Sequence, residues 1–453
     1  MRHVFTIISF IALLFCSGCK KYLNEKADGA ISFPDNLEAL QGLLNFTYGI
    51  NAVGVASSCI SSDDYYVTPS IFDFGTPSEK NICTWQNNNP DVRSDEWINT
   101  YGVIYTANTV LEQIDKIDIA PSDIISAMET KGEALFIRGK NHLELVTSFA
   151  KGYDHATASN EPGIPLRLTS DFNQKTVRST LEETYTQIIS DLKNSIPLLP
   201  KIPANELQPS KAAVYGMLAR TYLGMRDYAN CQLYSDSCLR EKPDLMDYNT
   251  IVESPAPFQL FKIPEMIYNC ANGGSIFFYD SYGYVDSVLY QSYDSNDLRR
   301  KVFFRDNGNG TYAFRGVGNY CSQLGFFDGI ATDEVYLMRA ECFARSGDLV
   351  SAMNDLDALL KNRYSNKTPY INHTVTDKAQ ALGLILKERR KELVLRGGLR
   401  WMDLKRLNIE GANITLKRVV GANTYTLPPN SPRYANPIPD EVIRLSGMKQ
   451  NVY

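Results

Sequence analysis

Apolar and small residues recur at helical spacing along most of the chain, and one pattern occurs twice. A bulky residue is followed four positions later by an alanine and seven positions later by another bulky residue, so that all three share one helix face. The alanine allows a neighbouring helix to approach closely. The pattern consists of Tyr215, Ala219 and Tyr222 in one segment and of Tyr336, Ala340 and Phe343 in the other.

A helix-turn-helix unit is predicted around each copy. Asp227 and Asp348 follow the two patterns and are suited to cap the next helix, and Gly347 can take the left-handed conformation that ends the preceding one. Looser versions of the spacing end at His142 and Leu393. The sequence therefore predicts a mostly α-helical protein with four tetratricopeptide-like hairpins, near 97–150 with 180–199, 209–241, 332–363 and 376–407.

Two segments between the helical units lack this periodicity. Residues 57–97 and 251–330 are rich in Tyr, Phe, Asn, Asp, Ser, Gly and Pro, a composition typical of long loops with short strands. Ordered loops of this length on a rigid scaffold are where binding sites are commonly built. We therefore expect one domain over 19–453, with a loop-rich ligand-binding lobe formed by these two segments.

Composition and charge exclude several classes of protein. The 453 residues are 44% hydrophobic and 21% charged, as in ordinary globular proteins. A net charge of −5 supplies no basic excess for phosphate groups, so nucleic acid is not an expected partner. The 27 tyrosines outnumber the 20 phenylalanines, and tyrosine suits surfaces that are partly apolar and partly wet.

The first 18 residues have the pattern of a signal peptide. An apolar run from Val4 to Phe15 is too short to span a bilayer and is followed closely by Ser17, Gly18 and Cys19. A cysteine in this position resembles the lipidated N-terminus of a mature bacterial lipoprotein, and a plain cleavage site nearby is the alternative. We expect residues 1–18 to be removed and Cys19 to anchor the chain to a membrane through its acyl chains.

The sequence contains no recognisable catalytic or metal motif. G-x-S-x-G, H-E-x-x-H and the phosphate-loop signature are missing, so we predict no catalytic residue, no metal and no cofactor. Asp63 and Asp64 could suggest a carboxylate pair for glycoside hydrolysis. Adjacent residues of an extended segment point to opposite faces, however, and a turn or a solvated edge is the favoured interpretation. Cys231 and Cys238 are predicted to be small core residues, beyond disulfide reach of each other.

Several short motifs, in their order and spacing, carry a resemblance to a known family. They begin with the lipoprotein signal and include GIPL at 163–166 and PIPDE at 437–441. The most specific are KERRKEL at 387–393 and RWMDL at 400–404. Together they resemble the SusD/RagB-like outer-membrane lipoproteins of Bacteroidetes over essentially the whole chain.

The resemblance implies a function that composition does not reveal. Members of the family are surface-exposed binding proteins that perform no covalent chemistry and sit as a lid on a SusC-like TonB-dependent outer-membrane transporter. They capture glycans, or peptides in some members, for import. For this chain it implies a glycan-binding lipoprotein of the cell outer membrane that faces the exterior. The alternatives are a peptide-binding member of the family and a tetratricopeptide scaffold that binds partner peptides.

Aromatic residues of the two loop-rich segments are the candidate ligand contacts. Trp85 is followed by four amide residues, and so combines a plane for the C–H face of a sugar with partners for its hydroxyls. The alternative is a buried Trp85 that steadies its loop. We expect fewer than half of the loop aromatics to be exposed, because loops of this size need apolar clusters of their own. The predicted ligand-binding residues are Trp85, Asn88, Tyr65, Tyr66, Tyr279, Tyr282 and Tyr284.

The motifs near the C-terminal hairpin are predicted to be structural. The charged residues Glu388, Arg389, Asp403 and their neighbours are expected to form a network around the packed indole of Trp401. Asn108 is likewise expected to be a core amide that bonds a neighbouring backbone.

Overall fold

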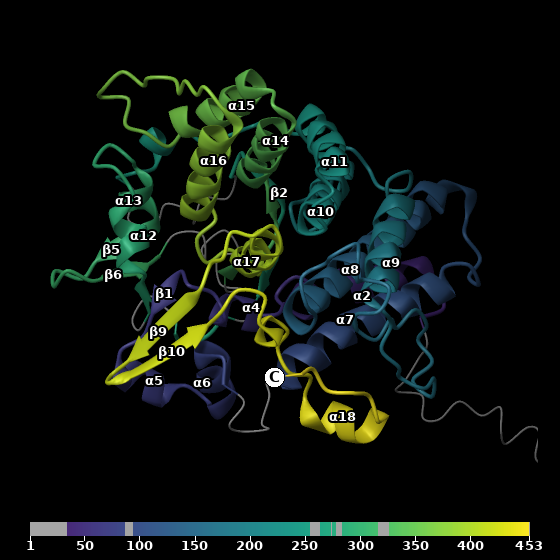
Figure 1. Cartoon of the computed structure of the whole chain (residues 1–453). Helices are drawn as coiled ribbons and strands as arrows, with labels where there is room; N and C mark the ends of the chain where they lie inside the picture. Colours follow the sequence, from purple (N-terminus) through teal and green to yellow (C-terminus); the bar gives the residue numbers. More distant parts are fainter. Residues whose placement is uncertain are drawn as a thin grey trace, which may run out of the picture.

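A computed structural model of the chain (Figure 1) describes residues 34–86, 94–253, 263–272, 274–277, 283–315 and 326–452. The predicted signal peptide and Cys19 lie outside the described residues, as do Asn88, Tyr279 and Tyr282. In the part of the chain that is described, no helix has both the length and the apolar character needed to cross a membrane.

Helices make up one side of the molecule, and each packs against the next along an arc. In Figure 1 this arc runs from α8 and α9 on the right through α10 and α11 to α14, α15 and α16 at the top. The mostly α-helical prediction is confirmed. The helices of this scaffold are α7 (Ser94–Gln113), α8 (Ile124–Phe149), α9 (Leu181–Ser195), α10 (Lys211–Gly224), α11 (Tyr228–Glu241), α14 (Thr332–Ser346), α15 (Leu349–Lys361) and α16 (Lys378–Glu392).

The two copies of the repeated pattern form helix pairs with the predicted caps. The side chain of Asp227 accepts a hydrogen bond from the Asn230 amide at the start of α11, and Asp348 caps α15 in the same way. Gly347 ends α14 with a left-handed φ of 98°. Ala219 is fully buried in the first pair, as is the matching alanine in the second, so both lie at helix contacts as predicted.

The last helix pair is packed differently from the others. α16 packs against α14 and α15, whereas α17 (Leu399–Ile409) packs against α8, α10 and the short helix α4 (Ser57–Ile60). The chain therefore turns inward after α16, and α17 lies where the scaffold meets the loop-rich lobe (Figure 1).

The loop-rich lobe contains more helix than the sequence pattern indicated. Residues 57–84 form the short helices α4, α5 (Pro69–Phe74) and α6 (Pro77–Thr84). Such helices complete only one or two turns, so they show no periodicity. Local signals hold them instead, since Thr68 and Thr76 cap α5 and α6 and a proline follows each cap.

Short antiparallel strand pairs complete this lobe. Their partners are far apart in the sequence in three of the five pairs. Two further short helices, α12 (Ser287–Gln291) and α13 (Arg299–Phe303), lie between the strands. The pairs are β1 (Tyr65–Tyr66) with β4 (Tyr284–Val285), β2 (Met266–Tyr268) with β8 (Ile330–Ala331), β3 (Ala271–Asn272) with β7 (Phe326–Phe327), β5 (Phe304–Asp306) with β6 (Tyr312–Phe314), and β9 (Leu416–Val420) with β10 (Asn423–Leu427).

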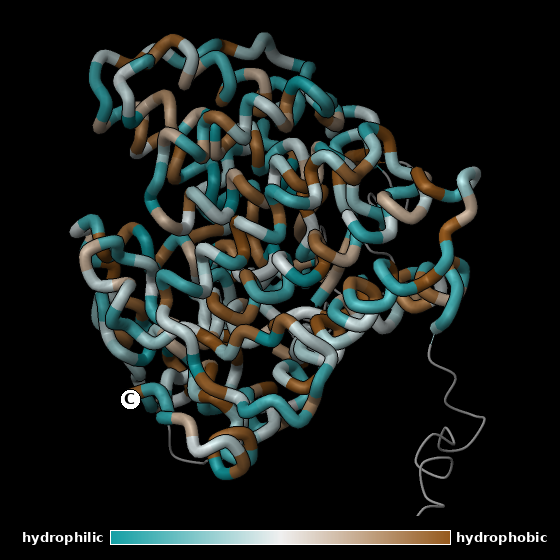
Figure 2. The backbone as a smooth tube through the Cα atoms, turned by 90° about the vertical axis from the view of Figure 1, so that its right-hand side faces the viewer, coloured by the Kyte–Doolittle hydropathy of each residue, from teal (hydrophilic) through white to brown (hydrophobic). Residues whose placement is uncertain are grey.

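Helices α2 (Leu37–Leu44) and α3 (Thr47–Ile50) pack beside α7 at the opposite end of the scaffold from α16, and α18 (Asp440–Ser446) lies near the end of the chain. Single helical turns occur at Pro121–Asp123, Tyr248–Thr250 and Pro432–Tyr434. Figure 2 shows that hydrophobic and hydrophilic residues alternate over short distances in the described part of the chain. Separate apolar cores fill the scaffold and the loop-rich lobe.

A buried ionic network joins the loop-rich lobe to the scaffold. Arg299, the first residue of α13, is fully buried, and its guanidinium lies 2.6 Å from Glu388 and 2.9 Å from Glu392 of α16. Arg299 also pairs with Asp297 at 2.7 Å, and Arg363 reaches Glu392 at 2.7 Å. Each buried charge thus has partners, and the loss of one partner would leave another charge uncompensated.

Helix α17 carries both the indole of Trp401 and part of a second charged cluster. The ring is fully buried, and its Nε1 donates a hydrogen bond to the Tyr434 carbonyl at 3.2 Å. Asp403 pairs with Arg389 and with Arg406, each at 2.8 Å. The predicted structural role of these motif residues is confirmed.

Candidate ligand-binding site

Tyr66 and Tyr284, two of the predicted ligand-binding residues, lie together on the loop-rich lobe. They face each other across the β1–β4 pair, and their rings stack with centroids 5.3 Å apart. Both side chains are half-buried, so part of each remains accessible. Burial raises the pKa of the Tyr66 hydroxyl, and the neighbouring Tyr284 adds to the shift. The Tyr66 phenol therefore stays a neutral hydrogen-bonding group around neutral pH.

Tyr65 is adjacent to Tyr66 and points into the core, because successive strand residues face opposite sides. The ring is 3% exposed, and its hydroxyl donates a hydrogen bond to the Ile60 carbonyl at 2.6 Å. The Arg418 guanidinium lies over the ring, 4.2 Å from the centroid. Tyr65 therefore anchors β1 in the core and so holds Tyr66 in position on the opposite face of the strand.

Trp85 ends helix α6 in a left-handed conformation with φ of 55°. Its indole is 3% exposed, packs in a small core with Trp401, and donates a hydrogen bond from Nε1 to the Ser61 carbonyl at 3.0 Å. This arrangement matches the alternative interpretation, in which Trp85 steadies its loop. The sequence pattern did not reveal that the residue ends a helix, because α6 is too short to show a periodicity.

Tyr290 and Tyr312 extend the aromatic surface beyond the predicted residues. Their rings stack with centroids 3.4 Å apart, and β6, which carries Tyr312, contacts β4, which carries Tyr284. We call Tyr66, Tyr284, Tyr312 and Tyr290 the tyrosine strip. Neither residue was among the predicted ligand contacts. The Asn-Gly pairs at 307–310 are a local signal of the β5–β6 hairpin that could have pointed to Tyr312.

A groove with a volume of about 890 Å³ begins at Tyr290. Its walls come from the turn at Tyr248–Thr250, the segment 295–306 with α13 and β5, and the segment 365–367 that follows α15. Its lining mixes amides such as Asn249 and Asn366 with basic side chains. The volume lies within the range of about 300–1,000 Å³ that is typical of ligand sites.

Arg300 links the groove to the tyrosine strip. Its guanidinium lies over the Tyr290 ring, 4.8 Å from the centroid, and donates a hydrogen bond to the Tyr290 hydroxyl at 3.3 Å. A cation held in this way is fixed in position while its other N–H groups stay free to bind a ligand. Sequence analysis missed Arg300, and the basic run at 299–301 was the signal that could have indicated it.

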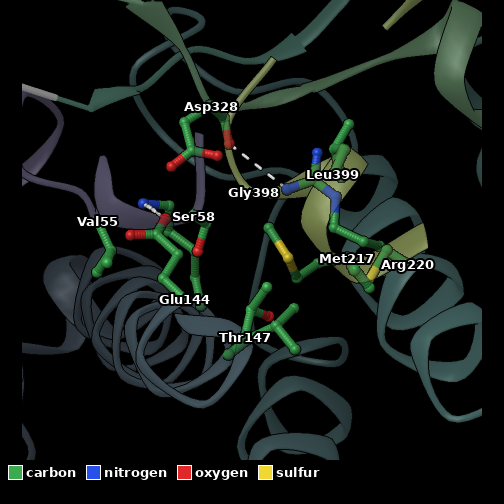
Figure 3. A pocket seen from close by; sticks show the side chains of 12 residues that line it. Val55, Ser58, Glu144, Thr147, Met217, Arg220, Asp328, Gly398 and Leu399 are labelled. Atoms are coloured by element: carbon green, nitrogen blue, oxygen red, sulfur yellow. Dashed lines mark hydrogen bonds and ion pairs between the residues drawn. The ribbon is translucent and has the colours of Figure 1, made fainter. Parts of the chain in front are cut away.

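A second cavity lies deep between α4, α8, α10 and α17 (Figure 3). It contains the buried ion pair of Lys140 and Glu144, together with Asp328 and Ser58. Burial raises the pKa of Glu144 to about 8, although Lys140 acts in the opposite direction. With a volume of about 30 Å³ the cavity has room for one or two water molecules and is too small for a sugar ring.

Asp63 and Asp64 do not form the turn or solvated edge that the sequence favoured. Asp64 is 1% exposed, and Arg400 holds Asp63 through two bonds of 2.6 and 2.8 Å. Burial alone would raise the pKa of Asp63, but Arg400 and Arg390 outweigh it and hold the pKa well below its usual range. The two carboxylates are thus committed to ion pairs with Arg400 of α17 and with Arg390 of α16, which approaches Asp64 at 3.4 Å.

Asn108 has the structural role that was predicted. Its Nδ2 donates hydrogen bonds to the carbonyls of Arg167 at 3.0 Å and Thr169 at 3.1 Å, and its Oδ1 accepts one from Arg138. Cys231 and Cys238 are fully buried, as predicted. The described residues contain no cluster of three or more His, Cys, Asp or Glu side chains that could hold a metal ion.

Exposed aromatic side chains are few, and most lie away from the loop-rich lobe. Phe74 on α5 is the one described loop aromatic that is largely exposed, in line with the expectation that fewer than half would be. Phe46 and Tyr48 lie beside α2 and α3, and Tyr105 lies on α7. The described part of the loop-rich lobe therefore offers the half-buried faces of Tyr66, Tyr284 and Tyr312, whereas Tyr290 is buried at 8% exposure. The scaffold end offers an exposed apolar surface.

The fold and this site together define a class of binding protein, in which a helical scaffold supports a loop-rich lobe with an aromatic strip and a polar groove. A family model described as "Starch-binding associating with outer membrane" matches residues 21–223, and one described as "SusD family" matches residues 333–453. The chain belongs to the SusD/RagB-like family.

Solved structures share the fold over nearly the whole chain. A SusD superfamily protein from Bacteroides thetaiotaomicron has 19% identity and a TM-score of 0.76, over 92% of this chain and 100% of that one. A SusD superfamily protein and a SusD-like carbohydrate binding protein, both from Bacteroides vulgatus, have identities of 21% and 19% and TM-scores of 0.73 and 0.71. Both matches cover 92% of this chain, and they cover 98% and 97% of the other chains. No curated protein matches the chain.

Proposed function

We propose that this protein is a surface-exposed glycan-binding lipoprotein that captures an oligosaccharide or polysaccharide and delivers it to a SusC-like TonB-dependent transporter. It is anchored in the cell outer membrane by lipid on Cys19, faces the exterior and performs no covalent chemistry. The observation that carries the proposal is the tyrosine strip that leads into the groove at Tyr290.

Sugar binding needs two kinds of surface, and both occur at this place. The C–H face of a sugar ring packs on an aromatic plane, and the hydroxyls at its rim need amide or charged partners. The stacked pair of Tyr66 and Tyr284 supplies the plane. Asn249 and Asn366 in the groove, with Arg300 between groove and strip, supply polar partners.

The other predicted site residues have supporting parts in this proposal. Tyr65 and Trp85 are buried under the β1 end of the strip, where both contact Arg418. They would hold Tyr66 in place without contacting the ligand. Asn88, Tyr279 and Tyr282 remain proposed ligand contacts, because they lie within a few residues of Trp85 or Tyr284 in the sequence.

A peptide ligand is the alternative function, because aromatic planes and amide groups also bind peptides.

An exposed apolar surface at the far end of the scaffold suits contact with another protein. At this end the Gln41 side chain of α2 forms a hydrogen bond with Ser126 of α8 at 2.6 Å. Phe46, Tyr48 and Ile125 are exposed at this end. We assign this surface to the transporter and keep the loop-rich lobe for the nutrient.

The first prediction separates ligand contact from structural support. Tyr66→Ala combined with Tyr284→Ala should weaken binding of a glycan found on a glycan array at least tenfold, about 1.4 kcal/mol, because the stacked plane is lost. The thermal midpoint should change little, since both side chains are half-buried at the edge of a two-stranded pair. Isothermal titration calorimetry and thermal unfolding measure the two effects.

Two controls accompany this experiment. Tyr66→Phe keeps the plane and should retain most of the binding. Trp85→Ala should lower the thermal midpoint because the indole is buried and hydrogen-bonded. Full binding by the double alanine variant would remove the tyrosine strip from the site, and binding on a parallel peptide panel but on no glycan would favour the alternative function.

A further inference from the structure

The groove carries a charge opposite to that of the whole protein. The chain has a net charge of −5, yet five basic side chains line the groove against three acidic ones. One of the acidic residues, Asp297, is buried and already neutralised by Arg299 at 2.7 Å and Lys391 at 2.9 Å. Two carboxylates, Glu253 and Asp306, are then left to oppose the basic side chains.

Several of these cations have no carboxylate partner. Within the described residues, Lys301 and Lys367 form no ion pair, and both are exposed. Arg300 bonds to the neutral hydroxyl of Tyr290 and likewise has no carboxylate partner among the described residues. The positive charge of the groove is therefore available to a ligand.

Two segments that adjoin the groove in the sequence carry no acidic residue. The segments that continue the chain from Glu253 and Arg315, residues 254–262 and 316–325, contain one lysine and no aspartate or glutamate. A concave surface with one sign of charge attracts ligands of the opposite sign and repels those of the same sign.

We infer that the groove selects acidic glycans, whose sugars carry carboxylate or sulfate groups. The inference rests on the proposed glycan-binding function and names the substrate class of that site. Neutral sugar rings of the glycan stack on the half-buried rings of the tyrosine strip, and an acidic group of the same glycan lies in the groove. There Arg300 donates its free N–H groups to the anion, and Lys301 and Lys367 add attraction at longer range.

A glycan fits these features better than an acidic peptide does. Tyr290 lines the groove and its ring is stacked on Tyr312, so a ligand in the groove lies next to one end of the tyrosine strip. Arg300 is held over the ring of Tyr290 and presents its guanidinium at this junction. An acidic sugar combines a ring for stacking with a planar or tetrahedral anion at its edge. These two parts match the aromatic strip and the basic groove beside it.

The test compares acidic oligosaccharides with neutral counterparts of the same backbone. The full-length mature protein is titrated with oligogalacturonate and with its carboxyl-reduced form, and with chondroitin sulfate oligosaccharide and its desulfated form. In at least one pair the acidic form should bind at least tenfold more tightly. That advantage should shrink as the salt concentration rises from about 0.02 to about 0.3 M, because salt screens the charges.

Substitutions locate the effect in the groove. Arg300→Gln combined with Lys367→Gln should weaken binding of the acidic form much more than binding of the neutral form, and should so remove most of the preference. Lys116→Gln makes the same type of charge change at an exposed site after α7 and should preserve the preference. If Arg300→Gln lowers the thermal midpoint, Lys301→Gln with Lys367→Gln repeats the test on two exposed side chains.

The possible outcomes distinguish this inference from the proposed function. Equal or tighter binding of neutral glycans would overturn the acidic preference and leave the glycan-binding function in place. Polyglutamate that binds as tightly as the acidic glycans would also overturn it, since charge alone would then explain the binding. The absence of binding to any glycan on a broad array would overturn the proposed function itself.

Discussion

His142 illustrates how one residue position sets a pH dependence. In the helix pattern it occupies the place of Tyr222 and Phe343 in the two regular copies. Its ring is fully buried, and neither ring nitrogen has a hydrogen-bond partner among the described residues. Burial lowers its pKa to about 3, and the neighbouring Arg138 contributes to the shift.

The lowered pKa of His142 determines how the stability of the fold changes with pH. An unfolded histidine binds a proton near pH 6.5, whereas the folded one stays neutral down to about 3. The stability contributed by neutral His142 is therefore fully present above pH 6.5 and is lost progressively as the pH falls toward 3.

His142→Phe should remove this acid sensitivity, because phenylalanine places an apolar ring at the same position. At pH 5 the wild-type protein should lose roughly 2 kcal/mol that the variant keeps, since each unit of pKa corresponds to about 1.4 kcal/mol. Urea unfolding at pH 7.5 and pH 5 measures the difference between the two proteins. A variant with the same loss of stability between these pH values as the wild type would contradict the assignment.

At the scale of elements, small residues and helix caps determine how the scaffold packs. Ala219 on α10 and Ala340 on α14 are fully buried, so neighbouring helices approach closely at these points. The aspartate caps begin the second helix of each pair directly after a short turn. A methyl group at the contact thus has the same structural importance as the apolar stripe around it.

Ala340→Trp should overpack the α14 contact and lower the free energy of unfolding by about 1 to 3 kcal/mol or more. Val350→Trp on α15 is the matched control, because Val350 is 72% exposed and has room for a larger side chain. Chemical denaturation of both variants gives the comparison. Equal stability of the two would show that Ala340 does not lie at a tight helix contact.

At the scale of the whole molecule, the scaffold and the loop-rich lobe are joined by buried charges. Arg299 links α13 to α16, and Arg400 links α17 to Asp63 beside β1. Because the tyrosine strip and most of the groove lie on the lobe, these ion pairs hold the ligand surface in a fixed position on the scaffold. Such a rigid arrangement suits the proposed presentation of a ligand to a transporter.

Attachment to the membrane is predicted to depend on Cys19 alone. Cys19→Ala should move the protein from the membrane fraction to the soluble fraction without changing its thermal midpoint, because the acyl anchor is lost and the fold is untouched. The experiment uses a strain that lacks the transporter partner, and fractionation with immunoblotting measures the distribution. Continued membrane retention in that strain would argue against the lipid anchor.

The sequence by itself determined the features that depend on neighbouring residues. The helices around Ala219 and Ala340 and their caps at Asp227 and Asp348 were predicted correctly, because helix periodicity and capping involve residues only a few positions apart. The order of the C-terminal motifs likewise indicated the family.

Only the tertiary structure decided how the ligand surface is assembled. Tyr66 meets Tyr284 across more than two hundred residues of sequence, and the groove combines segments near 249, 300 and 366. The burial of Trp85 also depends on a distant partner, since its small core includes Trp401. Contacts between such distant segments are set by how whole elements pack, and no local pattern of residues records them.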